Sequence, residues 1–263
     1  MLSHIEPHQQ NDRDCFEGPD GSRERFADFM QPGDLNFGEG DWEAQMPDYL
    51  GCCRALDDNL KRVIDKLKER GLYEDTVIIY TSDHGCHFKT HVKDVVEDGY
   101  DDYKRSCYES AVHIPMVIAG PGFEKGMRNE KIVELIDIPK TIVSIAGGDV
   151  SGMHGADLRE SQDAEKEWKE EAYIQISESY LGRAIRTKKW TYCIYDPEKN
   201  PNVYAASNCY RERFLFDNEA DPDQKNNLAA DAAYLEVRKE LARRLMQRAK
   251  EAGEEAFEIV DIK

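Results

Sequence analysis

The sequence predicts an α/β fold: a mostly parallel sheet flanked by helices, followed by a small antiparallel sheet and a helix. One observation is the helix, strand, loop, strand, helix order across residues 47–148. Another is a group of short, closely spaced strand patterns after residue 171, ended by an amphipathic pattern. With 263 residues, 40% of them apolar, the chain is long enough to bury a sizeable core.

The elements of the first part follow from changes of pattern. The first 45 residues are rich in charged residues, Gly and Pro and are expected to form a long surface loop. From 47 to 67 apolar residues recur at spacings of three and four, which predicts a helix ended by Gly71. A β-branched run at 76–81 is typical of a strand buried on both faces of a parallel sheet. A second strand is expected at 114–119 and a helix at 139–146.

The second part begins after the charged segment 160–171. Four strands are expected, at 172–177, 183–187, 190–195 and 214–217, followed by a helix at 232–251. We therefore expect an α/β domain over residues 1–160 and an antiparallel subdomain with a terminal helix over residues 161–263.

Charge and cysteine content exclude several functions. Lys and Arg number 35 and Asp and Glu 53, so the formal net charge is −18, which argues against nucleic acid or an anionic membrane as a partner. No stretch approaches the roughly 20 apolar residues of a membrane span, and we expect no signal peptide and a cytoplasmic location. The seven cysteines are odd in number and form no C-x-x-C pair, which favours reduced thiols.

Asp83 and His84 follow the first predicted strand, at the end where α/β sheets bind ligands. A carboxylate oxygen beside an imidazole nitrogen is a suitable pair of ligands for a divalent cation. The alternative is that Asp83 caps the following turn and His84 packs in the fold. Both interpretations stay open for the dipeptide alone.

The loop from 86 to 105 gathers cations in an otherwise acidic chain. Local positive charge of this kind indicates an anion pocket, although interleaved Asp and Glu residues are also compatible with a solvated loop. Near the start of the chain, His4 and His8 lie in a segment rich in amides, a weak signal by itself. The cations of the loop are His87, Lys89, His91, Lys93, Lys104 and Arg105.

Together these segments resemble the sulfatase family, within the alkaline phosphatase superfamily. The motifs occur in the family's order and spread from residue 5 to residue 228. They are Ile-Glu-Pro-His at 5–8, Thr-Val-Ile-Ile-Tyr-Thr-Ser-Asp-His-Gly at 76–85, Lys-Arg-Ser-Cys-Tyr-Glu at 104–109, His-Ile-Pro at 113–115, Gly-Pro-Gly at 120–122, Ile-Asp-Ile-Pro-Lys-Thr at 136–141, Ala-Ile-Arg-Thr-Lys-Lys-Trp-Thr-Tyr at 184–192, Leu-Phe-Asp-Asn-Glu-Ala-Asp-Pro at 215–222 and Asn-Asn-Leu at 226–228.

The resemblance implies an alkaline-phosphatase-like sandwich and a sulfuric ester hydrolase of the arylsulfatase type. Asp83 and His84 match the family's second pair of metal ligands, for calcium or, alternatively, magnesium or manganese. Lys104 matches the lysine that contacts the sulfate ester and steadies the leaving oxygen. His8 matches the histidine that contacts the sulfate and protonates a leaving group.

The other cations of the loop, His87, Lys89 and Arg105, are expected to bind the substrate. That substrate would be a small sulfate ester or a sulfated glycan. Two alternatives remain: a phosphate or phosphonate ester hydrolase of the same superfamily, and a non-catalytic module that binds an anion or a partner.

The sequence departs from the family pattern in three places. The C/S-x-P-x-R nucleophile motif and the first pair of Asp ligands are not found, and His113 stands where the family often has Arg. We therefore expect the C-terminal portion of a sulfatase, a truncated or partial chain, or a natural half, that is inactive alone and holds its metal weakly. An opened sheet would expose an edge, so we expect self-association or pairing with an N-terminal half.

Overall fold

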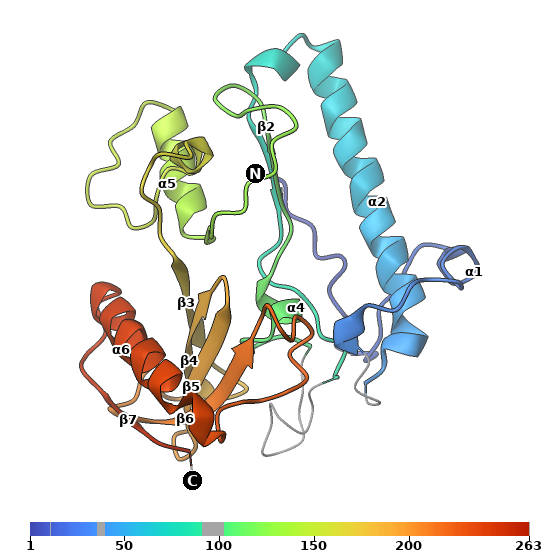
Figure 1. Cartoon of the computed structure of the whole chain (residues 1–263). Coiled ribbons are helices and arrows are strands. Elements are labelled where there is room, and N and C mark those ends of the chain that lie inside the picture. Colours follow the sequence, from blue (N-terminus) through green and yellow to red (C-terminus); the bar gives the residue numbers. More distant parts are fainter. Residues whose placement is uncertain (11, 36–39, 91–102, 263) are drawn as a thin grey trace.

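The computed structural model describes residues 1–10, 12–35, 40–90 and 103–262. Two separate sheets organise these residues (Figure 1). A two-stranded sheet pairs β1 (Ile78–Thr81) with β2 (Met116–Ala119), and a five-stranded sheet has the order β3-β4-β5-β6-β7. The mixed α/β class predicted from the sequence is confirmed.

The first 45 residues contain short helices as well as loop. These are α1 (Ser22–Arg25) and a 3-10 turn at Gly33–Leu35, and α1 packs against the long helix α2 (Trp42–Glu69). Helix α2 begins at Trp42, five residues before the predicted start, so Pro47 lies within the helix rather than at its beginning. Its buried residues lie in its first half, close to an aromatic cluster that includes Phe16, Phe88 and Tyr103.

The direction of the first sheet corrects the sequence prediction. β1 and β2 run antiparallel, with Ile79 opposite Ile118 and Thr81 opposite Met116. All four residues of β1 are only partly buried, whereas the prediction required burial on both faces. A continuous apolar run indicates that a strand tends to be buried. It does not indicate the direction of the partner strand, which depends on the connection between the two strands.

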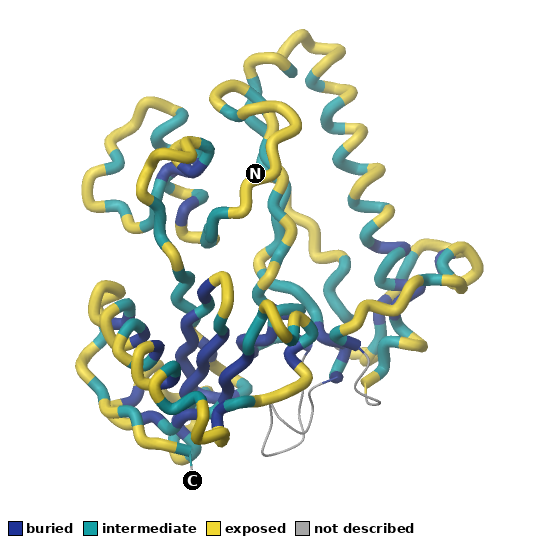
Figure 2. Tube along the Cα trace, in the orientation of Figure 1, coloured by how far each residue is buried: buried dark blue, intermediate teal, exposed yellow. Residues whose placement is uncertain are grey.

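The second sheet contains most of the buried core. Strands β3 (Glu171–Ile176), β4 (Leu181–Thr187), β5 (Trp190–Asp196) and β6 (Cys209–Asp217) pair antiparallel in sequence order. Helix α6 (Leu235–Glu251) packs on this sheet through Leu241 and Leu245, as its period predicted. Figure 2 shows that buried residues concentrate here, whereas β1 and β2 are mostly intermediate or exposed.

Strand β7 (Glu258–Val260) is an element that the sequence analysis missed. It pairs parallel to β6, so the C-terminal sheet is antiparallel except at this edge. The remaining elements are α4 (Glu109–Val112), α5 (Asp137–Ile145) and 3-10 turns at Tyr73–Asp75, Leu158–Gln162 and Ala232–Tyr234. The two sheets lie on opposite sides of the predicted boundary at residue 160.

All seven cysteines are free thiols, as the sequence predicted. Among the helices formed by the described residues, none combines the length and apolar character that a membrane crossing requires.

Candidate active site

The loop after β1 is fixed by backbone pairing to α4. The N–H of Gly85 donates to the carbonyl of Ala111, and the N–H of Cys86 donates to the carbonyl of Ser110, both at 2.8 Å. This contact needs a glycine, because a Cβ at position 85 would lie 2.0 Å from the Ser110 carbonyl oxygen. Asp83 and His84 are thereby held at the carboxyl end of β1.

His84 is oriented for binding a cation. Its Nδ1 lies 2.9 Å from the carbonyl oxygen of Gly85, and since a carbonyl only accepts, Nδ1 donates to it and Nε2 is the ring nitrogen left to face a ligand. Nε2 lies 3.6 Å from Oδ2 of Asp83. Desolvation raises the pKa of Asp83, but nearby His84 and hydrogen bonds from the backbone of His84 and Asp83 and from the Ser82 side chain together outweigh it. The pKa of Asp83 therefore lies below its ordinary value. The Asp83 carboxylate and Nε2 of His84 are therefore the atoms that this loop presents to a cation.

Two donors do not make a full coordination sphere. Within residues 1–10, 12–35, 40–90 and 103–262, no group of three or more His, Cys, Asp or Glu side chains is placed to hold a metal ion. The chemistry of Asp83 and His84 fits part of a divalent cation site.

His8 and Lys104 meet although 96 residues separate them. Nζ of Lys104 lies 3.0 Å from Nε2 of His8. The ammonium can only donate, so Nε2 accepts, and Nδ1 of the same ring lies 2.5 Å from the carbonyl oxygen of Gln9. Residues 103 and 105 both have positive φ, which turns the chain sharply on each side of Lys104.

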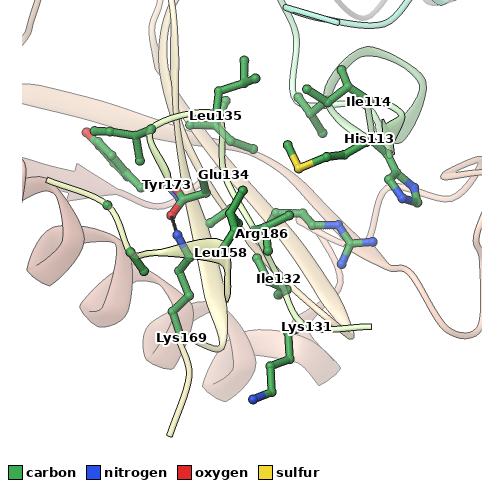
Figure 3. A pocket seen from close by; sticks show the side chains of 18 of the residues that line it. His113, Ile114, Lys131, Ile132, Glu134, Leu135, Leu158, Lys169, Tyr173 and Arg186 are labelled. Carbon is green, nitrogen blue, oxygen red and sulfur yellow. Dashed lines mark hydrogen bonds and ion pairs between the residues drawn. The ribbon is translucent and has the colours of Figure 1, made fainter. Parts of the chain in front are cut away.

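Asp83, His84, Lys104 and Arg105 line one large cleft, with a volume of about 2060 Å³. Its other walls are formed by β2, β3 and the segments 123–136 and 154–169, part of which Figure 3 shows from close by. The cleft exceeds the roughly 300–1000 Å³ of ordinary small-molecule pockets. It therefore has room for a ligand larger than a single anion.

The three residues predicted to bind substrate lie in three different surroundings. His87 is buried, and its Nε2 lies 3.3 Å from the carbonyl oxygen of Lys104, so it supports the Lys104 backbone. Lys89 donates to both carboxylate oxygens of Asp14, at 2.8 and 3.0 Å. Arg105 lines the cleft and pairs with Glu178.

Two further cations of the loop, His91 and Lys93, lie outside the described residues.

The sequence analysis did not predict a charged group on the wall of the cleft, formed by Glu109, His113 and Arg186. Glu109 lies between two cations, since its Oε1 is 2.8 Å from Nδ1 of His113 and 2.8 Å from a terminal nitrogen of Arg186. The Glu109–His113 spacing of four on a helix could have indicated the first pair. No sequence signal indicated Arg186, which comes from β4, 77 residues away.

Comparisons with known proteins show which family the chain resembles. The sulfatase family model matches residues 1–148, and the model described as N-sulphoglucosamine sulphohydrolase, C-terminal, matches residues 97–251. Arylsulfatase K of Bos taurus is 30% identical over 69% of this chain and 33% of its own length. N-acetylglucosamine-6-O-sulfatase of Bacteroides thetaiotaomicron is 30% identical over 80% of this chain and 37% of its own length.

Solved structures show the same similarity. A protein solved in complex with its substrate D-glucosamine-2-N,6-O-disulfate superposes with a TM-score of 0.62 at 26% identity, over 88% of this chain and 46% of that one. Phosphonate monoester hydrolase of Silicibacter pomeroyi gives 0.63 at 25% identity, over 86% of this chain and 44% of that one. The chain spans about a third of the length of the curated relatives it matches.

Proposed function

Because this chain belongs to the sulfatase family, we propose that it carries metal- and anion-binding residues of an enzyme that hydrolyses sulfate esters of sugars. The observation that carries this proposal is the contact between His8 and Lys104, since Lys104 lines the same cleft as Asp83 and His84. Four residues from distant parts of the sequence thus supply two cation ligands, a fixed positive charge and a proton carrier.

Each side chain has a distinct task in such a reaction. The ammonium of Lys104 would stabilise negative charge that develops on the sulfuryl group and on the departing ester oxygen. Nε2 of His8 already accepts a hydrogen bond from Lys104 and is the atom that would hold a proton and donate it to the leaving oxygen. Buried His87 would keep the Lys104 backbone in place.

Sulfatases generally use a divalent metal ion, and here Asp83 and His84 would hold it. When bound, the ion would withdraw charge from the sulfuryl oxygens. We propose calcium as the ion, with magnesium and manganese as alternatives, and weak binding, since the described residues supply two donors.

A sulfated sugar is the proposed substrate class. The similar proteins include an N-acetylglucosamine-6-O-sulfatase and a structure with a disulfated glucosamine as its substrate. The size of the cleft is consistent with a sugar attached to the reacting ester. A phosphonate ester is the second candidate, since a phosphonate monoester hydrolase has a similar structure.

Binding of aryl esters by the 263-residue polypeptide tests the proposal. With calcium present, we expect 4-nitrophenyl sulfate to bind. Lys104→Ala should weaken that binding at least tenfold, because the ionic contact between the ammonium and the sulfate group is lost. Lys61→Ala, on the exposed face of α2, is the matched control. Equal binding by Lys104→Ala and the unchanged chain would contradict the assignment, and tighter binding of 4-nitrophenyl phosphate would favour the second candidate.

We also propose that this polypeptide alone does not turn over the ester, because its sequence contains no C/S-x-P-x-R motif. Release of 4-nitrophenol by the purified chain would refute this part of the proposal while leaving the binding assignment intact.

A further inference from the structure

The group formed by Glu109, His113 and Arg186 lines the wall of the cleft and carries a net positive charge when His113 is protonated. Arg186 contacts the Glu109 carboxylate through two nitrogens, at 2.8 and 3.1 Å, and His113 contacts it at 2.8 Å. When His113 is protonated, two positive charges face one negative charge. The group is therefore cationic in a protein whose net charge is −18.

Exposure separates the three members. The side chains of Glu109 and Arg186 are 22% and 21% exposed, whereas that of His113 is 75% exposed. The third nitrogen of Arg186 donates to the carbonyl oxygens of Thr187 and Lys188. All three guanidinium nitrogens of Arg186 thus donate to protein atoms. His113 is the member that can meet a ligand, and Figure 3 draws it beside Arg186 in the cleft.

Glu109 also favours the charged form of His113. The hydrogen bond to Glu109 raises the pKa of His113, and this effect outweighs burial and the repulsion from Arg186. Glu109 faces the imidazole from α4 and Arg186 from β4, while Arg105 and Lys188 line the same cleft. The imidazolium should therefore persist closer to neutral pH than that of an isolated histidine.

We propose that His113 binds a second sulfate group of the sugar whose reacting ester lies at Lys104. The inference rests on the proposed function and extends it, because it names a polysulfated sugar as the preferred substrate. Lys104 and His113 lie nine residues apart, on one segment and in one cleft. Glu109 and Arg186 hold His113 in place without touching the ligand.

Calorimetric titration of the 263-residue chain with N-acetyl-D-glucosamine 6-O-sulfate, which is uncharged at its nitrogen at any pH used, and with D-glucosamine-2-N,6-O-disulfate tests this inference. At pH 6 we expect the disulfate to bind about three to five times more tightly, the factor of an exposed ion pair. His113→Gln should abolish this preference and leave the affinity for the monosulfate unchanged. The control His4→Gln, at an exposed histidine that does not line the cleft, should keep it.

The pH dependence gives a second readout. The preference should disappear as the pH rises to 9 and His113 loses its proton, whereas His113→Arg should keep the preference at both pH values because arginine stays charged. Equal weakening of both sugars by His113→Gln, or a preference that survives it, would overturn the inference but not the proposed function. Failure of the chain to bind either sugar would overturn both.

Discussion

At the scale of single residues, Glu109 links the stability of the fold to its charge state. Burial raises the pKa of Glu109, but hydrogen bonds from His113 and Arg186 outweigh burial and lower the pKa to about 2. A carboxyl group whose pKa is lower in the folded state contributes stability above its unfolded-state pKa, near 4.3, and loses it as the pH falls through the folded value. The window is therefore about pH 4.5 to 2.

We expect the free energy of unfolding of the unchanged chain to fall across this window by a few kcal/mol more than that of Glu109→Gln, which has no charge to lose. Urea unfolding at pH 6, 4, 3 and 2.5 measures both. Glu240→Gln is the control, because Glu240 is exposed and pairs with Arg243 on its own helix. Parallel curves for the Glu109 variant and the unchanged chain would show that its ion pairs do not stabilise the fold.

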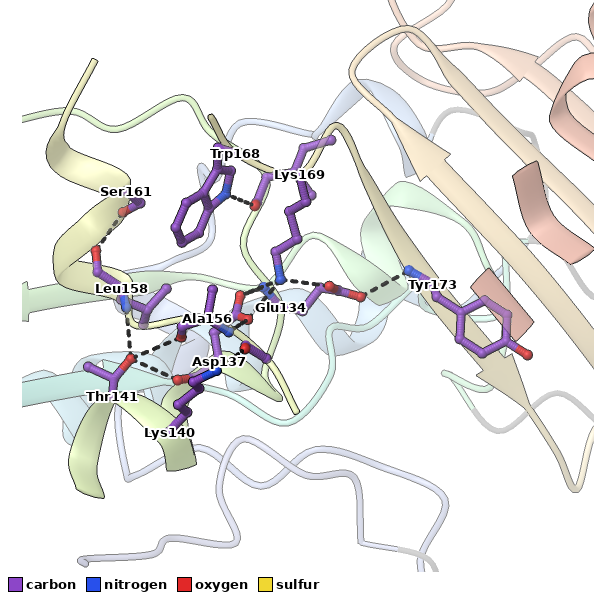
Figure 4. A network of polar contacts seen from close by, with 12 residues as sticks. Glu134, Asp137, Lys140, Thr141, Ala156, Leu158, Ser161, Trp168, Lys169 and Tyr173 are labelled. Carbon is purple, nitrogen blue, oxygen red and sulfur yellow. Dashed lines mark hydrogen bonds and ion pairs between the residues drawn. The ribbon is translucent and has the colours of Figure 1, made fainter. Parts of the chain in front are cut away.

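At the scale of elements, a buried ionic network joins α5 to the start of β3 (Figure 4). The fully buried carboxylate of Asp137 accepts from the backbone N–H groups of Glu134 and Ala156, both at 2.8 Å. Nζ of Lys169 lies 2.6 Å from Asp137 and 2.7 Å from Glu134. Glu134 in turn accepts from the backbone N–H of Tyr173 in β3.

Lys169→Met should destabilise the chain by about 3 kcal/mol, near the lower end of the cost of breaking a buried ion pair, because the backbone donors to Asp137 remain. Equilibrium unfolding in urea measures the loss. Lys166→Met is the matched control, since Lys166 is a half-exposed neighbour paired with Glu160. This variant should lower the free energy of unfolding by less than about 1 kcal/mol. Similar costs for the two variants would contradict a structural role for the network.

The C-terminal elements could be predicted because each is local. Strands β3 to β5 match their predicted ranges within two residues, and α6 follows its amphipathic period. Strand β7 was not predicted because three residues are too few to show an alternating pattern of apolar and polar side chains. The strand is defined by its pairing with β6. The antiparallel direction of β1 and β2 escaped for a similar reason, since strand direction depends on the path of the chain between them.

The candidate site shows the same division. Asp83 and His84 were found from their place after a predicted strand, but the contact between His8 and Lys104 was expected only through the family resemblance. Arg186 escaped because nothing in a sequence marks a contact 77 residues away. The ion pair of Lys89 could not be predicted for the same reason, since its partner Asp14 lies 75 residues earlier.

At the scale of the whole molecule, an exposed apolar strand and a large negative charge act in opposite directions. Within the described residues β1 and β2 pair only with each other, and Val117 at the centre of β2 is 62% exposed. An unpaired edge beside apolar side chains favours association with another strand. The net charge of −18 opposes association between copies of the chain, and salt screens this repulsion.

We therefore expect the 263-residue chain to self-associate, and to do so more strongly in 0.5 M than in 0.05 M NaCl. Sedimentation velocity at both salt concentrations measures the mass of the species. Val117→Lys should shift the distribution toward monomer, because a lysine on the edge strand removes apolar surface and disfavours pairing. Val203→Lys, at a valine that is 71% exposed in a turn between β5 and β6, adds the same charge and should leave association unchanged. A monomer at both salt concentrations, or equal effects of the two lysines, would show that the β1–β2 sheet is not the associating surface.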